Sequence, residues 1–132
     1  MVDANIFDET TENVFVHFRG TDGSLLWDDD QEVGVWILSI DSDAYKEIQD
    51  NIFRRLNKLK NPPKSVYDRA VIERLARSTV KFQGITMDNK PIEGLKETTE
   101  FYTRYRRIRE QIFEFIADED NFLANKPGSY TS

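Results

Sequence analysis

The residues best suited to chemistry are the arginines of "EFYTRYRRIREQIFEFIADED", residues 100–120. Arg104, Arg106, Arg107 and Arg109 stand among tyrosines and phenylalanines in this segment. A guanidinium group binds phosphate or carboxylate through a planar fork of donors, and it also stacks on aromatic rings. The segment therefore has three possible uses: a nucleic-acid contact, a protein-partner contact, or packing in an ordinary core.

Helical spacing places most apolar side chains of this segment on one side. At about 3.6 residues per turn, one arc collects Phe101, Tyr105, Ile108, Ile112, Phe115 and Ile116. Such an arc is typical of a helix that packs on a core. Arg109 falls inside the arc, and a guanidinium there must be paired, stacked or extended towards solvent. We expect an ion pair with Asp118 or Asp120, stacking on a tyrosine, or a place at a protein interface, where arginine is enriched.

The charge pattern disfavours a nucleic-acid partner. The chain of 132 residues carries a formal net charge of −6, whereas nucleic-acid binding depends on neutralising phosphates with Lys and Arg. Four glutamates are interspersed with the arginines: Glu97, Glu100, Glu110 and Glu114. We expect no nucleic-acid partner. The alternative that stays open is a small nucleic-acid-associated or regulatory module that uses the basic segments 54–64 and 104–109.

Metal and catalytic chemistry have little support in the sequence. Asp28–Asp30 could gather a divalent cation through carboxylate oxygens, yet three adjacent acids at a strand end are typical of a solvated turn. The chain has no cysteine, and His17 is its single histidine, which excludes thiolate and multi-histidine zinc sites. Neither a G-x-S-x-G elbow nor a Gly-Lys-Ser/Thr phosphate loop occurs. We expect no enzyme activity, no metal and no cofactor.

The N-terminal third predicts a small antiparallel sheet. Residues 14–19, "VFVHFR", alternate with a period of two, and "VGVWILSI" at 33–40 is a continuous apolar run typical of a buried strand. The intervening "GTDGS" has the glycines and aspartate of a turn.

The first expected helix covers residues 43–60. The segment Asp41–Asp43 supplies an N-cap and negative charge for its start. Apolar residues then recur at spacings of three and four, which makes one stripe of Tyr45, Ile48, Ile52, Leu56 and Leu59. The prolines at 62 and 63 end this helix.

Two further helices are expected. The second opens at Ser65, with Asp68 three residues later in a capping-box pattern. Its apolar side is formed by Tyr67, Val71, Leu75 and Phe82. A hairpin-like turn, "ITMDNKPIEG", separates it from the third helix, which covers residues 99–117 with Thr98 or Thr99 as its cap.

The order of these elements predicts an α+β fold: a small N-terminal antiparallel sheet with hairpins, followed by three main helices. We expect a single domain over residues 1–123 and a flexible C-terminal tail over 124–132. The acidic start "MVDANIFDET" has no signal-peptide pattern, and no apolar run is long enough to span a membrane.

Charge is unevenly distributed along the chain. Residues 28–32 and 41–50 are predominantly acidic, whereas "RRLNKLKNPPK" at 54–64 has five basic residues and no acid. Complementary patches on one molecule permit a head-to-tail contact between copies. The sequence therefore predicts a homo-oligomer.

Three segments carry a resemblance to a known family: "ILSIDSDAYKEI", "VIERLARSTVKFQGITMDNKPI" and "ETTEFYTRYRRIREQIFEFIADEDNFL". Over residues 33–123 their order resembles the tail assembly chaperones of long-tailed (siphovirus) phages, including the lambda-like and related groups. Phe82 and Gly84 stand at the family's aromatic–glycine segment, and Arg109 with Gln111 at its terminal-helix pattern. Phe82 replaces a tryptophan that is common there, and "NK" at 89–90 replaces a common glycine-containing turn.

The resemblance implies a non-enzymatic protein that binds the tape measure protein, keeps it soluble and helps recruit tail tube subunits. In such families a frameshifted longer form commonly contacts the tail tube protein. The implied location is the host bacterial cytoplasm, with no copy in the mature virion. Side chains expected at the partner surfaces are Trp27, Trp36, Tyr102, Arg104 and Arg109.

Overall fold

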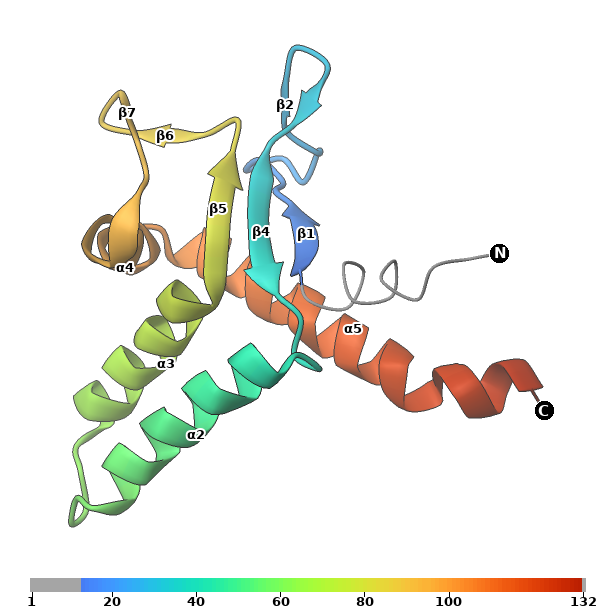
Figure 1. The fold of residues 1–132 in the computed structure, drawn as a ribbon. Coiled ribbons are helices and arrows are strands. Elements are labelled where there is room, and N and C mark those ends of the chain that lie inside the picture. The colour runs from blue at the N-terminus through green and yellow to red at the C-terminus, as the bar shows by residue number, and fades with distance from the viewer. Residues whose placement is uncertain (1–12, 132) are drawn as a thin grey trace.

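The computed structural model describes the backbone of residues 13–131 and the side chains as far as residue 118. Its main sheet has three antiparallel strands in the order β1-β4-β5: β1 (Asn13–His17), β4 (Gly34–Leu38) and β5 (Thr79–Gln83). Strand β4 is the central one (Figure 1). The α+β class is confirmed, and so is the expectation that the apolar run 33–40 contains a buried strand.

Strand β5 corrects the expected order of strands first and helices afterwards. Helix α3 (Lys64–Ser78) ends where β5 begins, so Phe82 belongs to the sheet and not to that helix. The hydroxyls of Ser78 and Thr79 each donate to the Leu75 carbonyl at 2.9 Å and satisfy the last turn. The spacing from Leu75 to Phe82 fits a helix, so the apolar pattern continues past the end of α3. The segment "TVKFQ" nevertheless has the β-branched and alternating residues of a strand.

Two short hairpins extend from the sheet (Figure 1). Strands β2 (Trp27–Asp28) and β3 (Gln31–Glu32) form the first, and β6 (Thr86–Met87) and β7 (Lys90–Pro91) form the second. The second confirms the expected hairpin-like turn, because Asp88 and Asn89 both have positive φ, 53° and 63°, as a type I′ turn requires.

The first two helices of the described chain make an antiparallel pair. Helix α2 (Asp43–Asn57) starts as expected, since the Ser42 hydroxyl accepts the Tyr45 N–H at 3.1 Å. The capping box expected for α3 is wrong: its N-cap is Pro63, and no side chain caps the first turn. A proline ahead of the helix already fixes an extended φ of −67° there.

The third expected helix is two helices, which makes four in the described chain. Helix α4 (Gly94–Arg104) and helix α5 (Arg106–Thr131) are separated at Tyr105, whose φ and ψ of −112° and 76° are not helical. In a continuous helix the Tyr102 carbonyl would accept the Arg106 N–H. The Arg109 guanidinium takes that position instead and donates to the Tyr102 carbonyl at 2.9 Å.

Helix α5 is traced to Thr131, well beyond the end expected at residue 117. The proposed tail 124–132 and the domain limit at 123 stay predictions, and residues 1–12 lie outside the described chain. Within residues 13–131, no helix combines the length and apolar composition needed to cross a bilayer.

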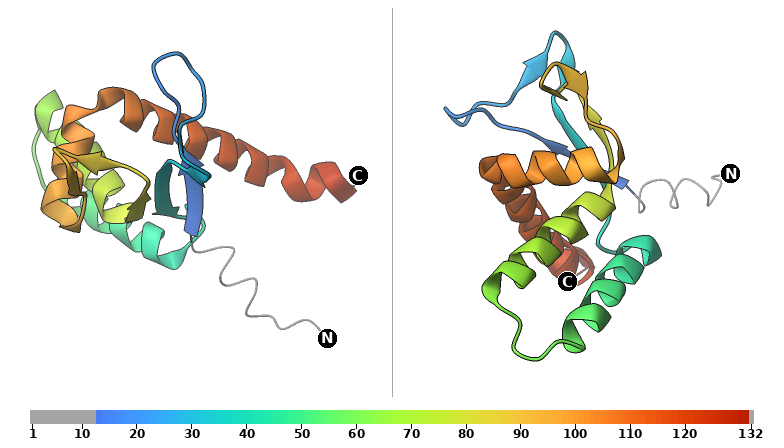
Figure 2. Two further views of the ribbon diagram at one scale, coloured as in Figure 1. Left: turned by 90° about the horizontal axis from the view of Figure 1, so that it is seen from above. Right: turned by 90° about the vertical axis from the view of Figure 1, so that its left-hand side faces the viewer.

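The core lies between the main sheet and helices α4 and α5, which pass on one side of it (Figure 2). Tyr102 and Phe101 are at its centre, exposed by 0% and 1%. The Phe82 ring contacts Phe101 edge-on, with a centroid distance of 4.9 Å. The Tyr102 hydroxyl is 2.6 Å from the Thr79 hydroxyl, which ties α4 to the point where α3 becomes β5. Burial strongly raises the pKa of Tyr102 and keeps the phenol neutral.

Replacement of Tyr102 tests this assignment to the core. Tyr102→Ala should lower the free energy of unfolding by about 3–5 kcal/mol because it leaves a large cavity. Tyr102→Phe should cost about 1 kcal/mol for the lost hydroxyl contact. Tyr67→Ala, at a side chain that is 47% exposed, is the control and should cost under about 0.5 kcal/mol. Urea denaturation measures all three, and equal effects of Tyr102→Ala and Tyr67→Ala would contradict the assignment.

Candidate protein-binding surfaces

Two of the expected partner residues, Trp27 and Trp36, lie on one aromatic surface. The register pairs Phe15 with Trp36 across β1 and β4, and their rings are 5.1 Å apart. His17 is 6.1 Å from Phe15 and meets Trp27 edge-on at 4.9 Å. Alternation along the strands puts these rings on the face opposite the buried Val16 and Val35.

The aromatic surface is held by polar contacts at its margin. The Trp36 indole N–H donates to Gln83 Oε1 at 3.2 Å, and Gln83 Nε2 donates to the Glu32 carbonyl at 2.9 Å. His17 is placed between the Leu26 carbonyl, 2.7 Å from its Nε2, and the Glu32 carboxylate, 3.5 Å from its Nδ1. Trp36 is therefore fixed and partly buried, whereas the Trp27 side chain is 55% exposed.

The other three expected partner residues do not join this surface. Tyr102 is fully buried, so its place among the partner-binding candidates is wrong: it is a core residue. Arg104 pairs with Asp88 at 2.9 Å and lies over the Tyr105 ring, 5.3 Å from its centroid. Arg109 is half-buried and bonded to the Tyr102 carbonyl.

Arg109 also differs from the ion pair expected for it. Its partner is a backbone carbonyl in place of Asp118, and the side chain of Asp120 lies outside the described residues. The expected arc was built on one continuous helix, and the break at Tyr105 rotates the two halves relative to each other. Arg106 is neutralised by Glu110 at 3.1 Å, so adjacent acids offset much of the charge of segment 104–109.

Helices α2 and α3 form an arm that leads away from the sheet (Figure 1). From residue 53 to residue 74 no side chain of the arm is buried. Four large apolar side chains are exposed there by 37–50%: Phe53, Leu59, Tyr67 and Val71. Tyr67 and Val71 are one helical turn apart and lie side by side. The sequence predicted them on the packed side of α3, so the structure reverses that expectation.

A groove of about 520 Å³ runs between the two helices of the arm. Its floor is apolar, with Leu56, Leu59 and Val66, and Arg55, Lys58 and Arg69 line its rim.

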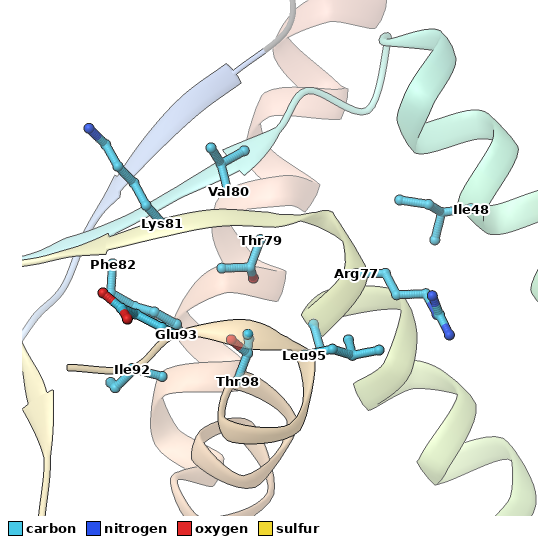
Figure 3. A pocket seen from close by; sticks show the side chains of 12 residues that line it. Ile48, Arg77, Thr79, Val80, Lys81, Phe82, Ile92, Glu93, Leu95 and Thr98 are labelled. Atoms are coloured by element: carbon cyan, nitrogen blue, oxygen red, sulfur yellow. The ribbon is translucent and has the colours of Figure 1, made fainter. Parts of the chain in front are cut away.

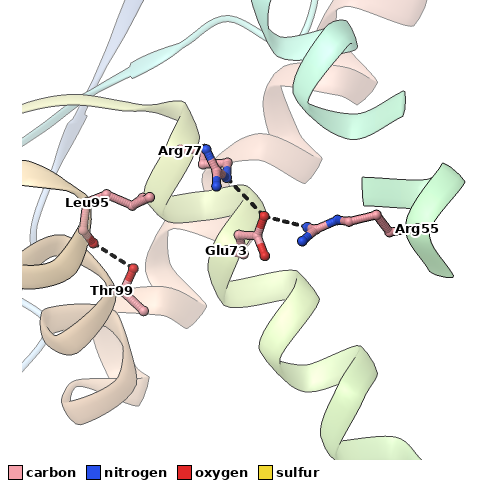
Figure 4. A network of polar contacts seen from close by, with 5 residues as sticks. All are labelled: Arg55, Glu73, Arg77, Leu95 and Thr99. Atoms are coloured by element: carbon pink, nitrogen blue, oxygen red, sulfur yellow. Dashed lines mark hydrogen bonds and ion pairs between the residues drawn. The ribbon is translucent and has the colours of Figure 1, made fainter. Parts of the chain in front are cut away.

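Glu73 is the polar link between α2 and α3 (Figure 4). Arg55 reaches its carboxylate from α2, and Arg77 donates to the same oxygen at 2.9 Å from one turn along α3. Partial burial acts against ionisation of Glu73, but the hydrogen bonds and charges of Arg77 and Arg55 outweigh it and hold the pKa of the carboxyl below its usual value. With so little apolar burial in the arm, this ion pair helps to keep the helices together.

A second groove, of about 500 Å³, lies along the free edge of β5. Val80 and Lys81 point to one side of the strand, and Thr79 and Phe82 point to the other, towards α4 (Figure 3). Ile92, Leu95 and Thr98 of the α4 region line the opposite wall, and Ile48 of α2 also lines the groove. This groove could not be predicted from the sequence, because Phe82 of β5 was expected to be helical.

Asp28–Asp30 form the turn of the β2–β3 hairpin, where Asp29 has a positive φ of 54°. In the described part of the chain, no three His, Asp or Glu side chains are close enough together to hold a metal ion. These acids, with Glu32, leave the hairpin beside Trp27 strongly negative.

Comparison with known proteins finds no family model, no curated protein and no solved structure that matches the chain.

Replacement of Glu73 tests the polar link of the arm. Glu73→Gln should lower the free energy of unfolding by about 1 kcal/mol at neutral pH, a small value because the arginines are largely solvated. A carboxylate whose folded-state pKa is lowered stabilises the fold above the unfolded-state pKa and loses that effect as the pH falls through the folded-state pKa. The difference from the wild type should therefore begin to shrink as the pH falls below the ordinary glutamate pKa of 4.5 and vanish only below the lowered folded-state pKa. Thermal unfolding at several pH values, with exposed Glu47→Gln as the control, checks this; a difference that grows in acid would contradict it.

Proposed function

We propose that the protein is a phage tail assembly chaperone that binds apolar helical segments of the tape measure protein and keeps them soluble. The observation that carries the proposal is the α2–α3 arm, which exposes Phe53, Leu59, Tyr67 and Val71 without burying any residue from 53 to 74. Exposed apolar groups gathered on one element mark a contact surface for another molecule. The resemblance of residues 33–123 to the tail assembly chaperones names the class of partner.

The arm suits an amphipathic helix. Such a helix places its apolar side chains at intervals of three and four, and a groove between two helices accepts them in a row. The apolar floor at Leu56, Leu59 and Val66 supplies the contact, and the basic rim at Lys58 and Arg69 favours acidic residues on the polar side of the bound helix. The chaperone acts in the host cytoplasm by binding alone, leaves before the virion is complete, and in a longer form brings tail tube subunits to the tape measure.

Co-expression with the tape measure protein of the same genome tests the proposal. The wild type should keep the tape measure protein soluble and purify with it. The double variant Leu59→Ser, Tyr67→Ser should lose most of that soluble complex, because it removes apolar contact from the groove and from α3 without touching a buried side chain. Leu25→Ser, at a side chain that is 40% exposed in the loop before β2, is the matched control. If the double variant and Leu25→Ser keep the tape measure protein equally soluble, the arm is not the binding surface.

For the expected homo-oligomer we propose a head-to-tail contact, supported by the uneven distribution of charge over the surface. The β2–β3 hairpin of one copy, with Trp27 beside Asp28–Asp30, is complementary in charge to the arm of the next copy. The arm carries the basic residues of this contact: Arg54, Arg55, Lys58, Lys60 and Lys64. An exposed tryptophan is a common centre of binding energy at protein interfaces.

Charge reversal on each side tests this contact. In sedimentation velocity the wild type should associate with rising concentration and dissociate at about 0.5 M salt, where exposed charges are screened. Asp28→Lys with Asp30→Lys, and separately Lys58→Glu with Lys60→Glu, should each be monomeric. A mixture of the two should associate again as the wild type does, because the intact hairpin meets an intact arm and the two reversed surfaces are also complementary in charge. Lys90→Glu with Lys96→Glu is the control, and self-association by either reversed variant alone would contradict the contact.

A further inference from the structure

The free edge of β5 has unpaired backbone groups, and their positions follow from the register. Phe18 continues the β1–β4 register opposite Val33 and donates to its carbonyl at 2.8 Å. Hydrogen-bonded and non-bonded pairs alternate along an antiparallel ladder. Two residues after Val33, the backbone N–H and C=O of Val35 therefore bond to β1. The backbone groups of Trp36 point the other way and bond to its β5 partner Lys81.

The same alternation turns the neighbouring residue of β5 outward. Phe82 lies opposite Val35, so its N–H and C=O point away from β4 and into the groove. Among the described residues these two groups have no hydrogen-bond partner. Unpaired backbone groups on an edge strand are a template for one more strand, and here Phe82 supplies one N–H and one C=O.

The groove has the lining that an added strand would need. On the core side, Ile92 and Leu95 face the position next to Phe82, and the Leu95 side chain is 43% exposed. On the other side, Lys81 points out of the sheet without an ion-pair partner among the described residues. Successive residues of a strand point to opposite faces, so an acidic residue opposite Lys81 and an adjacent apolar residue facing Leu95 would both be accommodated.

We propose that the β5 edge accepts an extended segment of a partner protein, in which an acidic residue adjoins an apolar one, as a fourth strand of the sheet. A second copy of β5 is a poor occupant. The register that pairs all five residues, 79–83, of two antiparallel copies places Lys81 directly opposite Lys81, and like charges in that position are destabilising. Lysine on an edge strand protects against such self-pairing. This surface is separate from the arm and does not depend on the function proposed above.

Selection from a random peptide library, with about ten residues per member to exceed the length of a typical strand, tests the proposal on the full chain. Peptides that combine acidic and apolar neighbours should be enriched. Lys81→Glu should weaken them about tenfold and, in a second selection, should favour basic peptides in their place. Lys90→Glu, in the neighbouring hairpin, should leave the affinity unchanged. Failure to enrich any peptide, or peptides that bind Lys81→Glu as tightly as the wild type, would overturn the proposal.

Amide hydrogen exchange on the complex with a selected peptide gives an independent test, because a non-specific charge contact would not change the exchange rate of a backbone amide. Binding should slow exchange of the Phe82 amide, while the amides of Lys81 and Gln83, which already face β4, should change little. Slowed exchange at Phe82 without peptide, together with dimer formation, would identify a second copy as the occupant and overturn the proposal. Loss of tape measure binding by the arm variants would leave this result untouched, so the two proposals fail separately.

Discussion

The arrangement of the core depends on the interruption of the helical chain at Tyr105. In a continuous helix over residues 99–117, Phe101 and Ile112 would lie on one straight element. Because that helix would be straight, it could not wrap around a small sheet. The interruption lets α4 and α5 approach the sheet in different directions, and both bury their apolar sides against it. Its cost is a carbonyl without a helical donor at Tyr102, and Arg109 supplies that donor. A charged donor in a half-buried position satisfies the carbonyl more strongly than a neutral one would.

Once the sheet, α4 and α5 have closed the core, little apolar surface is left to hold the arm. Helix α2 buries only Tyr45 and Ile52, and α3 buries residues only from Leu75 onward. The outer arm depends on half-buried contacts and on the Glu73 ion pairs, which are worth little individually in water. Low local stability of this kind is common in elements that bind other molecules. The exposed apolar groups of the arm and its weak packing thus have the same cause, because the core closes without the outer arm.

Local features of the sequence were predicted well. Ser42 caps α2 as expected, the run 33–40 contains the central strand, and the Asp88–Asn89 turn makes its hairpin, because each depends on neighbouring residues alone. The interruption at Tyr105 and strand β5 could not be predicted in this way, because both depend on contacts with residues that are distant in the sequence. The spacing of the apolar residues across each of these two places still fits a helix. The proximity of Trp27 and Trp36 also needed the strand register, since Phe15 and His17 connect them from another strand.

The identity of Lys81 shows how one residue can both protect and select. An unpaired edge beside an apolar groove would invite aggregation if its side chains were neutral, because any extended chain could pair with it. A lysine at the centre of the strand is repelled by the lysine of an identical edge and attracted by an acidic residue of another strand. The same charge therefore disfavours self-pairing and favours an acidic partner. The acidic balance of the chain acts in the same direction, since a net charge of −6 favours repulsion between copies. Charge therefore decides which contacts the exposed apolar surfaces can make.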